Sequence, residues 1–398
     1  MAWIVSGTPY RKGTGEAILS AMNGTIELCA SCAVGLERIL DGELGRLGAV
    51  VTKRGAGRVW FSGDDGLIAR ILVNSRIADR LFIVAGSFVA GDFDRLFEGV
   101  RAIPWERWVG KDDRLVVEKA RSLRSKLAAQ NAIQSISQKA AYERLCSHYR
   151  QSSMPETAGE RKVRIRIEDD RAEVELDLCG SPLSKRGYRR NATEAPLKET
   201  IAAGLLFLSG WKRSYPLYDP FCGGGTIAIE AALYALDFAP GLSRSFDWEG
   251  MPSGSSALVK EEKERARGRA SPARDVMIGG SDADEAAVRA AVANARLAGL
   301  ADRVRFFKAR AEDASPPSER GYVITDPPYG KRLGSPEEAS ALYDSLGPFA
   351  KRFKGWELCW VVDREDFKLP GLGKAKRNKI VDGAELRWFH RFIAGGSA

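Results

Sequence analysis

Residues 218–226 read Tyr-Asp-Pro-Phe-Cys-Gly-Gly-Gly-Thr, and this stretch carries most of the information about the fold. The residues around it predict a short buried strand over Leu217–Asp219 and a helix from Ile227 to about Leu236. Glycines between a strand and a helix let a ligand approach the backbone, and the helix N-terminus offers unpaired N–H groups. The stretch lacks the lysine of a phosphate-binding P-loop, and Ala228 breaks the G-x-G-x-x-G pattern. We therefore expect a ligand-binding loop of another kind, with a purely structural glycine turn as the alternative.

A carboxylate follows the next predicted strand downstream. That strand begins at Val276, and Asp282 stands at its end, 57 residues after Gly225. In a dinucleotide-binding fold an acidic residue about 20 residues after the glycines binds the ribose hydroxyls. The charged, Gly- and Ser-rich stretch 249–275 would then be an inserted connection. Asp282 is thus a candidate ribose ligand, and a helix N-cap at Asp282 or Asp284 is the alternative.

A third motif, Asp326-Pro-Pro-Tyr-Gly330, follows a strand predicted over Gly321–Thr325. Pro327 and Pro328 stiffen the loop and carry carbonyl acceptors without N–H donors. Asp326 adds a carboxylate and Tyr329 an aromatic ring. An exocyclic amine of a base could donate its hydrogens to Asp326 and a proline carbonyl while the base stacks on Tyr329. The motif therefore predicts an acceptor site for a group transferred to an amine.

Strands and helices alternate through the rest of the C-terminal half. Helices are predicted over 285–297 and 337–353, strands over 304–308 and 358–362, and a hairpin over 377–381 and 385–393. This pattern predicts a doubly wound, mainly parallel α/β sheet that ends in an antiparallel hairpin. Upstream, shorter strands and helices predict smaller α+β units, with a helix over 135–150 and a hairpin around Asp169-Asp170.

Composition narrows the partners and the compartment. The chain has 398 residues, and 61 basic against 52 acidic side chains give a net charge of +9, which favours a polyanionic partner such as nucleic acid. The longest apolar run is far shorter than the roughly 20 residues that span a bilayer. Only Cys29 and Cys32 form a C-x-x-C pair, too few thiolates for a four-cysteine zinc site. We expect a cytoplasmic protein without metal or membrane attachment.

A basic loop, residues 181–190, precedes the ligand motifs. It reads SPLSKRGYRR and gathers four cations around one aromatic ring, a composition suited to phosphate neutralisation and base stacking. A solvated loop without a ligand is the equally weighted alternative. The residues predicted to bind RNA are Lys185, Arg186, Tyr188, Arg189 and Arg190.

The motifs DPFCGGGT, GSDADE and TDPPYG, in this order, resemble those of class I S-adenosylmethionine-dependent methyltransferases that act on amino groups. Upstream, ELCASCAVGLERILDGELGRLGA, QSISQKAAYERL, GSPLSKRGYR and APLKETIAAGLLFLSGW resemble the THUMP-domain RNA methyltransferases. APGLSRSF and KRNKIVDG are similar to the bacterial branch that methylates guanine N2 in 23S rRNA. The resemblance covers about residues 26–398.

The resemblance implies a domain order and a cofactor, S-adenosylmethionine. It implies a ferredoxin-like domain over 26–90, a THUMP RNA-binding domain over 91–190 and a Rossmann-like methyltransferase domain over 191–398. Residues 1–25 are rich in Gly, Ser and Thr and lack periodicity, so we expect a flexible extension there, and we expect a monomer. It also implies roles for individual residues. Asp326, Pro327, Pro328 and Tyr329 would hold the guanine amine, Asp282 the ribose, and Asp313 or Glu312 the adenine. The methionine part would lie against Asp219, Pro220, Phe221, Cys222, Gly223, Gly224, Gly225 and Thr226.

Two departures from the family pattern keep alternatives open. Many rRNA relatives have Asn where this chain has Asp326, whereas Asp is common in relatives that act on tRNA, so tRNA is the alternative substrate. Arg310 stands where the family often has an Asp.

Two other functions remain as alternatives. A DNA adenine-N6 methyltransferase would use the same Asp-Pro-Pro-Tyr motif, and a non-catalytic RNA-binding protein is the alternative from another class.

Overall fold

The computed structural model describes residues 25–189, 197–328, 342 and 346–392. The chain forms two compact units. Unit 1 contains residues 25–27 and 84–176 of the described chain, and unit 2 contains the other described residues. Residues 1–24, which form nearly all of the predicted extension, lie outside the description.

The first elements of unit 2 follow the order β-α-β-β-α-β. They are β1 (Ile26–Ser31), α1 (Glu37–Arg46), β2 (Val50–Gly55), β3 (Arg58–Gly63), α2 (Asp65–Asn74) and the first part of β4 (Arg80–Val89). The strands lie in the order β2-β3-β1-β4, and β1 is antiparallel to β4. This is the ferredoxin-like arrangement, which confirms that part of the predicted fold. Helix α2 begins where it does because the Asp64 side chain accepts a hydrogen bond from the Leu67 N–H at 2.8 Å.

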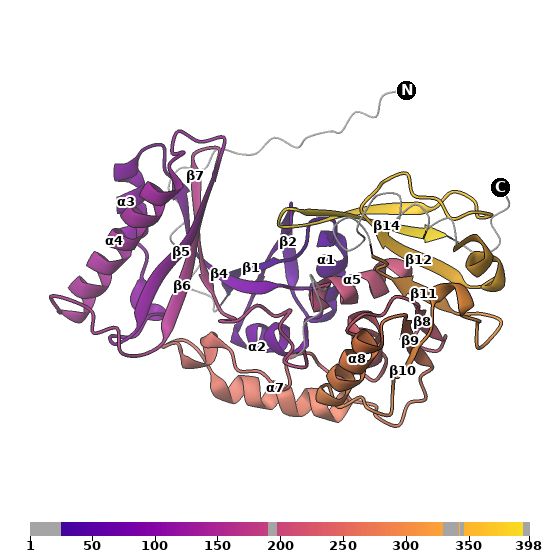
Figure 1. The fold of residues 1–398 in the computed structure, drawn as a ribbon. Helices are drawn as coiled ribbons and strands as arrows, with labels where there is room; N and C mark the ends of the chain where they lie inside the picture. Colours follow the sequence, from indigo (N-terminus) through magenta and orange to yellow (C-terminus); the bar gives the residue numbers. More distant parts are fainter. Residues whose placement is uncertain (1–24, 190–196, 329–341, 343–345, 393–398) are drawn as a thin grey trace. The chain divides into compact units, whose positions relative to one another are not determined.

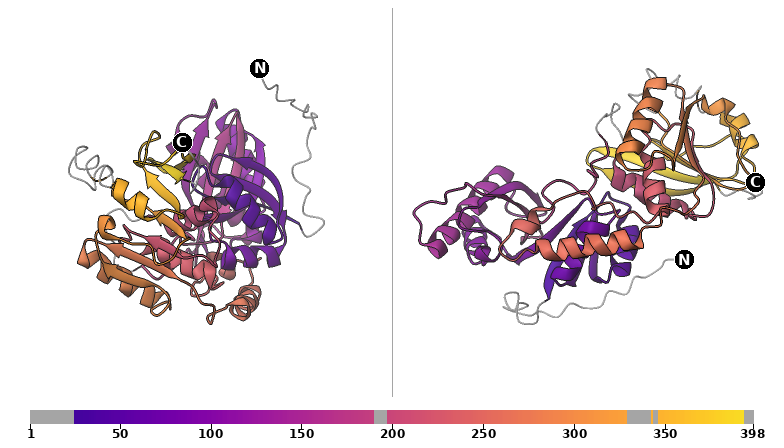
Figure 2. Two further views of the ribbon diagram at one scale, coloured as in Figure 1. Left: turned by 90° about the vertical axis from the view of Figure 1, so that its right-hand side faces the viewer. Right: turned by 90° about the horizontal axis from the view of Figure 1, so that it is seen from below.

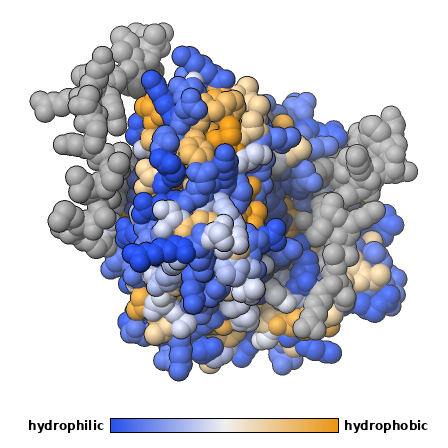
Figure 3. Space-filling view, turned by 90° about the vertical axis from the view of Figure 1, so that its left-hand side faces the viewer, coloured by the Kyte–Doolittle hydropathy of each residue, from blue (hydrophilic) through white to orange (hydrophobic). Residues whose placement is uncertain are grey.

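Unit 1 is a second α+β unit. It contains the end of β4, α3 (Phe93–Arg101), the short 3-10 helix η2 (Trp105–Arg107), β5 (Arg114–Leu123), α4 (Gln130–Tyr149), β6 (Glu160–Glu168) and β7 (Arg171–Asp177). Its strands lie in the order β4-β7-β6-β5, and α3 packs beside α4 (Figure 1). The predicted hairpin is present, with Asp169 and Asp170 both at positive φ, as a tight hairpin turn requires. The face turned to the viewer in Figure 3 is mostly hydrophilic, with hydrophobic residues gathered toward its upper part.

The rest of unit 2 is the predicted doubly wound domain. It contains α5 (Glu199–Ser209), β8 (Leu217–Asp219), α6 (Thr226–Ala235), the 3-10 helix η3 (Asp247–Gly250), α7 (Ser256–Arg269), β9 (Ile278–Asp282), α8 (Glu285–Leu297), β10 (Arg305–Lys308), the 3-10 helix η4 (Ala311–Asp313), β11 (Tyr322–Thr325), β12 (Glu357–Val362), β13 (Lys376–Asp382) and β14 (Glu385–Phe392). The strand order is β10-β9-β8-β11-β12-β14-β13. Pairing is parallel from β10 to β12, and β14 is antiparallel to both of its neighbours. The fold prediction is confirmed, including the C-terminal hairpin.

The strand order reverses between β8 and β11. From β8 the chain builds outward through β9 to β10, and it then returns to the other side of β8 to place β11 and β12. In open parallel sheets ligands bind at such a switch point, beside the carboxyl ends of the strands. The glycine loop follows β8 and Asp326 follows β11, so the topology brings the first and third motifs together.

Helices cover both faces of this sheet (Figure 2). On one face, Tyr218, Val323 and Trp360 pack with Phe349, in a helix that the structure describes over 346–352, and with Phe353 directly after it. On the other face, Phe306 approaches Ala291 of α8 across the glycine loop. Alternate side chains of each strand therefore enter two separate apolar layers, which hold the strand ends in register.

The inserted connection 249–275 differs from the expectation because it contains helix α7. Its N-cap Ser255 accepts a hydrogen bond from the Leu258 N–H at 3.2 Å. Buried Glu262, on the face of α7 toward α2, accepts a hydrogen bond from Asn74 at 2.8 Å. The helix has no continuous apolar stripe, which is why hydrophobic periodicity missed it. Of the helix predicted over 337–353, the structure describes residues 342 and 346–353, and 342 and 346–352 are helical.

Unit 2 also joins the ferredoxin-like strands to the sheet of the second half. Val34 and Val381 of β13 exchange two backbone hydrogen bonds, each 2.9 Å long. Helix α1 contacts α5 and helix α2 contacts α7. No helix in the described part of the chain combines the length and apolarity that a membrane span needs.

Candidate active site

A cavity of about 450 Å³ lies at the carboxyl ends of β8, β9 and β11. Its walls come from the loops that follow these three strands, as the switch-point topology predicts. Ten of the residues predicted from sequence line it: Asp219, Pro220, Phe221, Cys222, Gly223, Gly224, Thr226, Asp282, Asp326 and Pro328.

The glycine loop is anchored from both sides. The Cys222 N–H donates to the Ser281 carbonyl at 2.9 Å, which ties the loop to β9. The buried Asn294 side chain on α8 donates from Nδ2 to the Gly224 carbonyl at 2.9 Å. These bonds fix the loop while α6 begins at Thr226 and directs its first N–H groups toward the cavity. Asn294 has no motif of its own, so sequence reasoning missed it.

Gly225 does not line the cavity, but the loop needs a glycine there. Its φ is +82°, and an added Cβ would lie 2.8 Å from Phe306 and 3.0 Å from Ala291. Gly223 has φ +50° but faces open space. The last glycine therefore lets α6 and α8 approach, whereas Gly223 leaves room for a ligand.

Asp282 is held by the loop that it faces. Its Oδ2 accepts from the Gly223 N–H at 3.0 Å, and its Oδ1 accepts from the Asp284 N–H at 3.0 Å. Each carboxylate oxygen keeps a second lone pair for another donor. Asp284, which the sequence offered only as a cap, caps α8 through the Ala286 N–H at 2.8 Å and also lines the cavity.

Asp219 is completely buried at the end of β8. Its Oδ1 accepts hydrogen bonds from the Thr325 hydroxyl at 2.6 Å and the Phe221 N–H at 3.2 Å. Burial raises the pKa of Asp219 to about 7. The hydrogen bonds from Thr325 and Phe221 oppose this rise in the pKa, and the nearby carboxylates of Asp326 and Asp282 add to it.

The amine-acceptor motif lies partly within the described residues. Asp326 and Pro328 line the cavity, and Pro327 is buried behind them. Tyr329 lies outside the described residues. Asp326 follows Thr325 directly, and the Thr325 hydroxyl bonds to Asp219, so a second carboxylate enters the cavity beside Asp219.

The described lining is strongly acidic. Five carboxylates line the described part of the cavity, together with one arginine, Arg310, which is paired with Glu312. The acids are Asp219, Asp282, Asp284, Glu312 and Asp326. Such a lining favours a cationic ligand.

The two residues predicted to contact the adenine differ in their position relative to the cavity. Glu312 and Arg310 line the cavity, whereas the Asp313 side chain is exposed outside the lining. The placement of Asp313 in the site therefore lacks support. Both residues belong to the short helix η4, and only one of them faces the cavity.

The comparison with known proteins decides the family. YpsC of Bacillus subtilis (strain 168), provisionally named as an RNA methyltransferase, is 35% identical over 364 residues, which make up 89% of this chain and 93% of YpsC. The chain belongs to the RMKL-like methyltransferases. The model of their methyltransferase domain matches residues 186–380, and the RlmL ferredoxin-like domain matches residues 27–82.

Two further similarities extend this result. The ribosomal RNA large subunit methyltransferase K/L of Syntrophotalea carbinolica is 34% identical over 378 residues, 91% of this chain but 53% of that protein, so the chain spans about half its length. The crystal structure of SMU.472, provisionally named as a methyltransferase and solved with SAH, has a TM-score of 0.87 and 35% identity. The match covers 95% of this chain and 100% of that one. Membership of the family makes S-adenosylmethionine the methyl donor.

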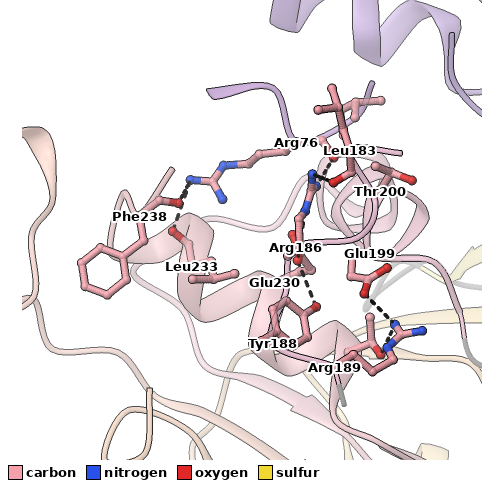
Figure 4. A network of polar contacts seen from close by, with 12 residues as sticks. Arg76, Leu183, Arg186, Tyr188, Arg189, Glu199, Thr200, Glu230, Leu233 and Phe238 are labelled. Carbon is pink, nitrogen blue, oxygen red and sulfur yellow. Dashed lines mark hydrogen bonds and ion pairs between the residues drawn. The ribbon is translucent and has the colours of Figure 1, made fainter. Parts of the chain in front are cut away.

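The prediction that Arg186 and Tyr188 of this RMKL-like methyltransferase contact RNA is wrong, because both side chains are buried (Figure 4). Arg186 donates to the carbonyls of Leu183 and Arg76, each at 2.6 Å, and its Nε lies 3.5 Å from Glu230 of α6. The Tyr188 hydroxyl donates to Glu230 at 3.0 Å. These two side chains are buried against helix α6, so they cannot contact a phosphate of RNA.

Arg189 also turns inward. Its Nη2 donates to the Leu197 carbonyl at 2.7 Å and to the Thr226 hydroxyl at 2.9 Å, and it lies 3.4 Å from Glu199 (Figure 4). Lys185 is exposed, and Arg190 lies outside the described residues. Sequence reasoning missed the acids Glu199 and Glu230 as partners. A single acidic residue inside an otherwise apolar helix, as at both positions, indicates a buried acid that needs a cationic partner.

The part of the chain that the structure describes holds no group of three or more His, Cys, Asp or Glu side chains placed to bind a metal. Cys29 and Cys32, the C-x-x-C pair, are buried thiols. Burial raises the pKa of Cys32, which opposes the thiolate that metal binding requires.

Proposed function

We propose that this RMKL-like methyltransferase transfers a methyl group to the exocyclic N2 amine of a guanosine in RNA, with 23S rRNA as the substrate and tRNA as the alternative. One observation carries the proposal. Asp326 and Pro328 line the same cavity as the glycine loop and Asp282. Acceptor groups for an amine therefore stand beside a place for the methyl donor.

The residues present fit S-adenosylmethionine. When bound, this cofactor supplies a methyl group on a sulfonium cation. The carboxylates that line the described cavity favour a cation. Asp282 keeps lone pairs for the ribose hydroxyls, and the loop from Asp219 to Thr226 would hold the methionine part. The open space above Gly223 is the backbone approach that a bound ligand needs.

Asp326 would prepare the amine. The lone pair of guanine N2 is delocalised into the ring, so the nitrogen is a poor nucleophile. A carboxylate that accepts one N–H hydrogen, with a proline carbonyl for the other, raises electron density on the nitrogen and fixes its direction of attack. Preorganised groups of this kind contribute several kcal/mol to lowering a barrier. Asp326 can also receive the proton that the amine releases.

The RNA substrate is supported by the relatives and by charge. YpsC is provisionally named as an RNA methyltransferase, and the Syntrophotalea protein is named for ribosomal RNA. The chain carries a net charge of +9 despite its acidic cavity, so its other surfaces are on balance basic. We assign RNA binding to a THUMP domain, proposed over 91–190, and to exposed Lys185.

The experiment is methyl transfer from labelled S-adenosylmethionine to RNA from a strain that lacks the gene, followed by mass spectrometry of the nucleosides. The expected product is N2-methylguanosine, lost in Asp326→Ala. Asp313→Asn is the matched control, because it removes a carboxylate outside the cavity lining and should leave the rate unchanged.

The substrates in that experiment separate the alternatives. Methylation of purified 23S rRNA but not tRNA supports the main proposal, and the reverse supports the tRNA alternative. N6-methyladenine in duplex DNA would replace the proposal with DNA methylation. Cofactor binding without transfer to any of these nucleic acids would favour a non-catalytic RNA-binding protein.

A further inference from the structure

Arg189 links two walls of the cavity without lining it. One nitrogen, Nη2, donates both to the Leu197 carbonyl, before α5, and to the Thr226 hydroxyl, the first residue of α6. Leu197 and Thr226 both line the cavity. Side-chain exposure is 15% for Arg189 and 7% for its ion-pair partner Glu199. Arg189 is thus a nearly buried cation that is separated from the cavity by a single hydrogen-bonded residue.

The contact fixes the role of the Thr226 hydroxyl. A hydroxyl carries one hydrogen and two lone pairs. A guanidinium can only donate, so the hydroxyl accepts from Arg189 and directs its own hydrogen elsewhere. The helix N-terminus at the same place adds N–H donors and a partial positive charge. The Thr226 hydroxyl can therefore donate a hydrogen bond to a ligand that binds at the start of α6.

The rest of the described cavity is unsuitable for an anion, because five carboxylates line it. The one lining arginine, Arg310, is paired with Glu312. A ligand with a cationic centre and a carboxylate must then place its carboxylate at the start of α6. The positive charge of the Arg189 guanidinium, which bonds to Thr226, further stabilises a carboxylate at the start of α6.

We propose that Arg189 is a positioning residue that sets the Thr226 hydroxyl as a donor to the carboxylate of the cofactor's amino-acid part. The inference rests on the proposed function, because it takes the cavity as the cofactor site. It also gives a function to loop residues 183–189, whose buried side chains contact α6. Glu230, four residues after Thr226, accepts from Tyr188 and faces Arg186, so segment 183–189 holds the same face of α6 at two successive turns.

The test compares two ligands by calorimetry. One is S-adenosylhomocysteine, and the other is S-adenosyl-3-thiopropylamine, which lacks only its carboxylate. The variants are Thr226→Val, which keeps the shape and removes the hydroxyl, and Arg189→Met. Each should weaken S-adenosylhomocysteine binding about tenfold and change binding of the decarboxylated ligand less than twofold. Thr226→Ser and Arg189→Lys, which restore the hydroxyl and the cation, should recover most of the affinity.

A double-mutant cycle on S-adenosylhomocysteine tests whether Arg189 acts through Thr226. The double variant should bind no more weakly than the weaker single variant, because both remove one interaction. Arg189→Met combined with Glu199→Gln keeps the test valid if the unpaired acid destabilises the fold.

Three outcomes would overturn the inference: additive losses, equal losses for both ligands, or wild-type protein that binds both ligands equally. A wild-type chain that binds neither ligand would instead overturn the proposed function, so the two failures are distinguishable.

Discussion

The Asp219 carboxylate accepts a hydrogen bond from the Thr325 hydroxyl at 2.6 Å, and this bond joins the ends of β8 and β11 at the switch point of the sheet. Each partner precedes one of the two motifs that carry the chemistry. The glycine loop continues from Asp219, and the Asp-Pro-Pro motif continues from Thr325. This buried contact therefore joins the two loops that we propose hold the cofactor and the amine.

Cofactor binding should depend on pH through Asp219. Burial raises its pKa to about 7, so the carboxyl is increasingly protonated below pH 7. A cationic cofactor prefers the ionised form. Affinity for S-adenosylmethionine should therefore fall as pH drops below 7, by up to about tenfold per pH unit. Asp219→Asn should flatten the calorimetric profile between pH 5 and 8; a slope that survives in this variant would assign the titration to another group.

The same group should affect stability in the opposite direction. Its folded-state pKa of about 7 exceeds the ordinary value of 3.8, so the unfolded chain loses the proton first. The free energy of unfolding should therefore decrease as pH rises from about 4 to 7 and level off above 7. Asp219→Asn should remove this decrease, as urea unfolding at pH 5 and pH 8 would show, whereas the exposed control Asp313→Asn should follow the wild type.

Arg186 should matter for folding rather than for RNA affinity. Arg186→Met leaves Glu230 buried beside Tyr188 without its cation, which costs about 3–5 kcal/mol of unfolding free energy. The neighbouring exposed Lys185→Met should change it by less than about 0.5 kcal/mol. Chemical denaturation measures both. A stable Arg186→Met variant that loses RNA affinity would restore the RNA-binding interpretation.

The basic loop shows where sequence reasoning reached its limit. Four cations beside a tyrosine predict a solvated or nucleic-acid-binding surface, because charged side chains are seldom buried. Arg186 is buried because Glu230 and the carbonyls of Leu183 and Arg76 surround it, and Glu230 and Arg76 come from distant segments. Pairing across such separations has no local pattern. The glycine loop, Asp282 and Asp326 were predictable because each lies at the end of a strand or directly after it, and parallel strands bring their carboxyl ends together.

Substitutions at Gly223 and Gly225, the two glycines of the loop after β8 that have positive φ, should differ in their effects on stability and on ligand binding. Gly225→Ala would place a Cβ 2.8 Å from Phe306, so it should lower the free energy of unfolding by about 1–3 kcal/mol. Gly223→Ala points into open space, so it should cost less stability but weaken S-adenosylhomocysteine binding by narrowing the cavity. Thermal unfolding and calorimetry on both variants measure the contrast. Equal effects of the two changes would contradict the assignment of Gly223 to the ligand side.

Single-turnover methyl transfer to RNA by the wild type, Asp326→Ala and Asp326→Asn measures whether Asp326 prepares a guanine amine for methylation. Asp326→Ala should bind cofactor and RNA normally and lose about a hundredfold or more in rate. Asp326→Asn should keep substantial activity, because an amide oxygen still accepts one hydrogen bond. If the Asn variant is as slow as Ala, Asp326 is also the proton acceptor. Full activity in Asp326→Ala, with N2-methylguanosine still formed, would contradict the account and place the amine elsewhere.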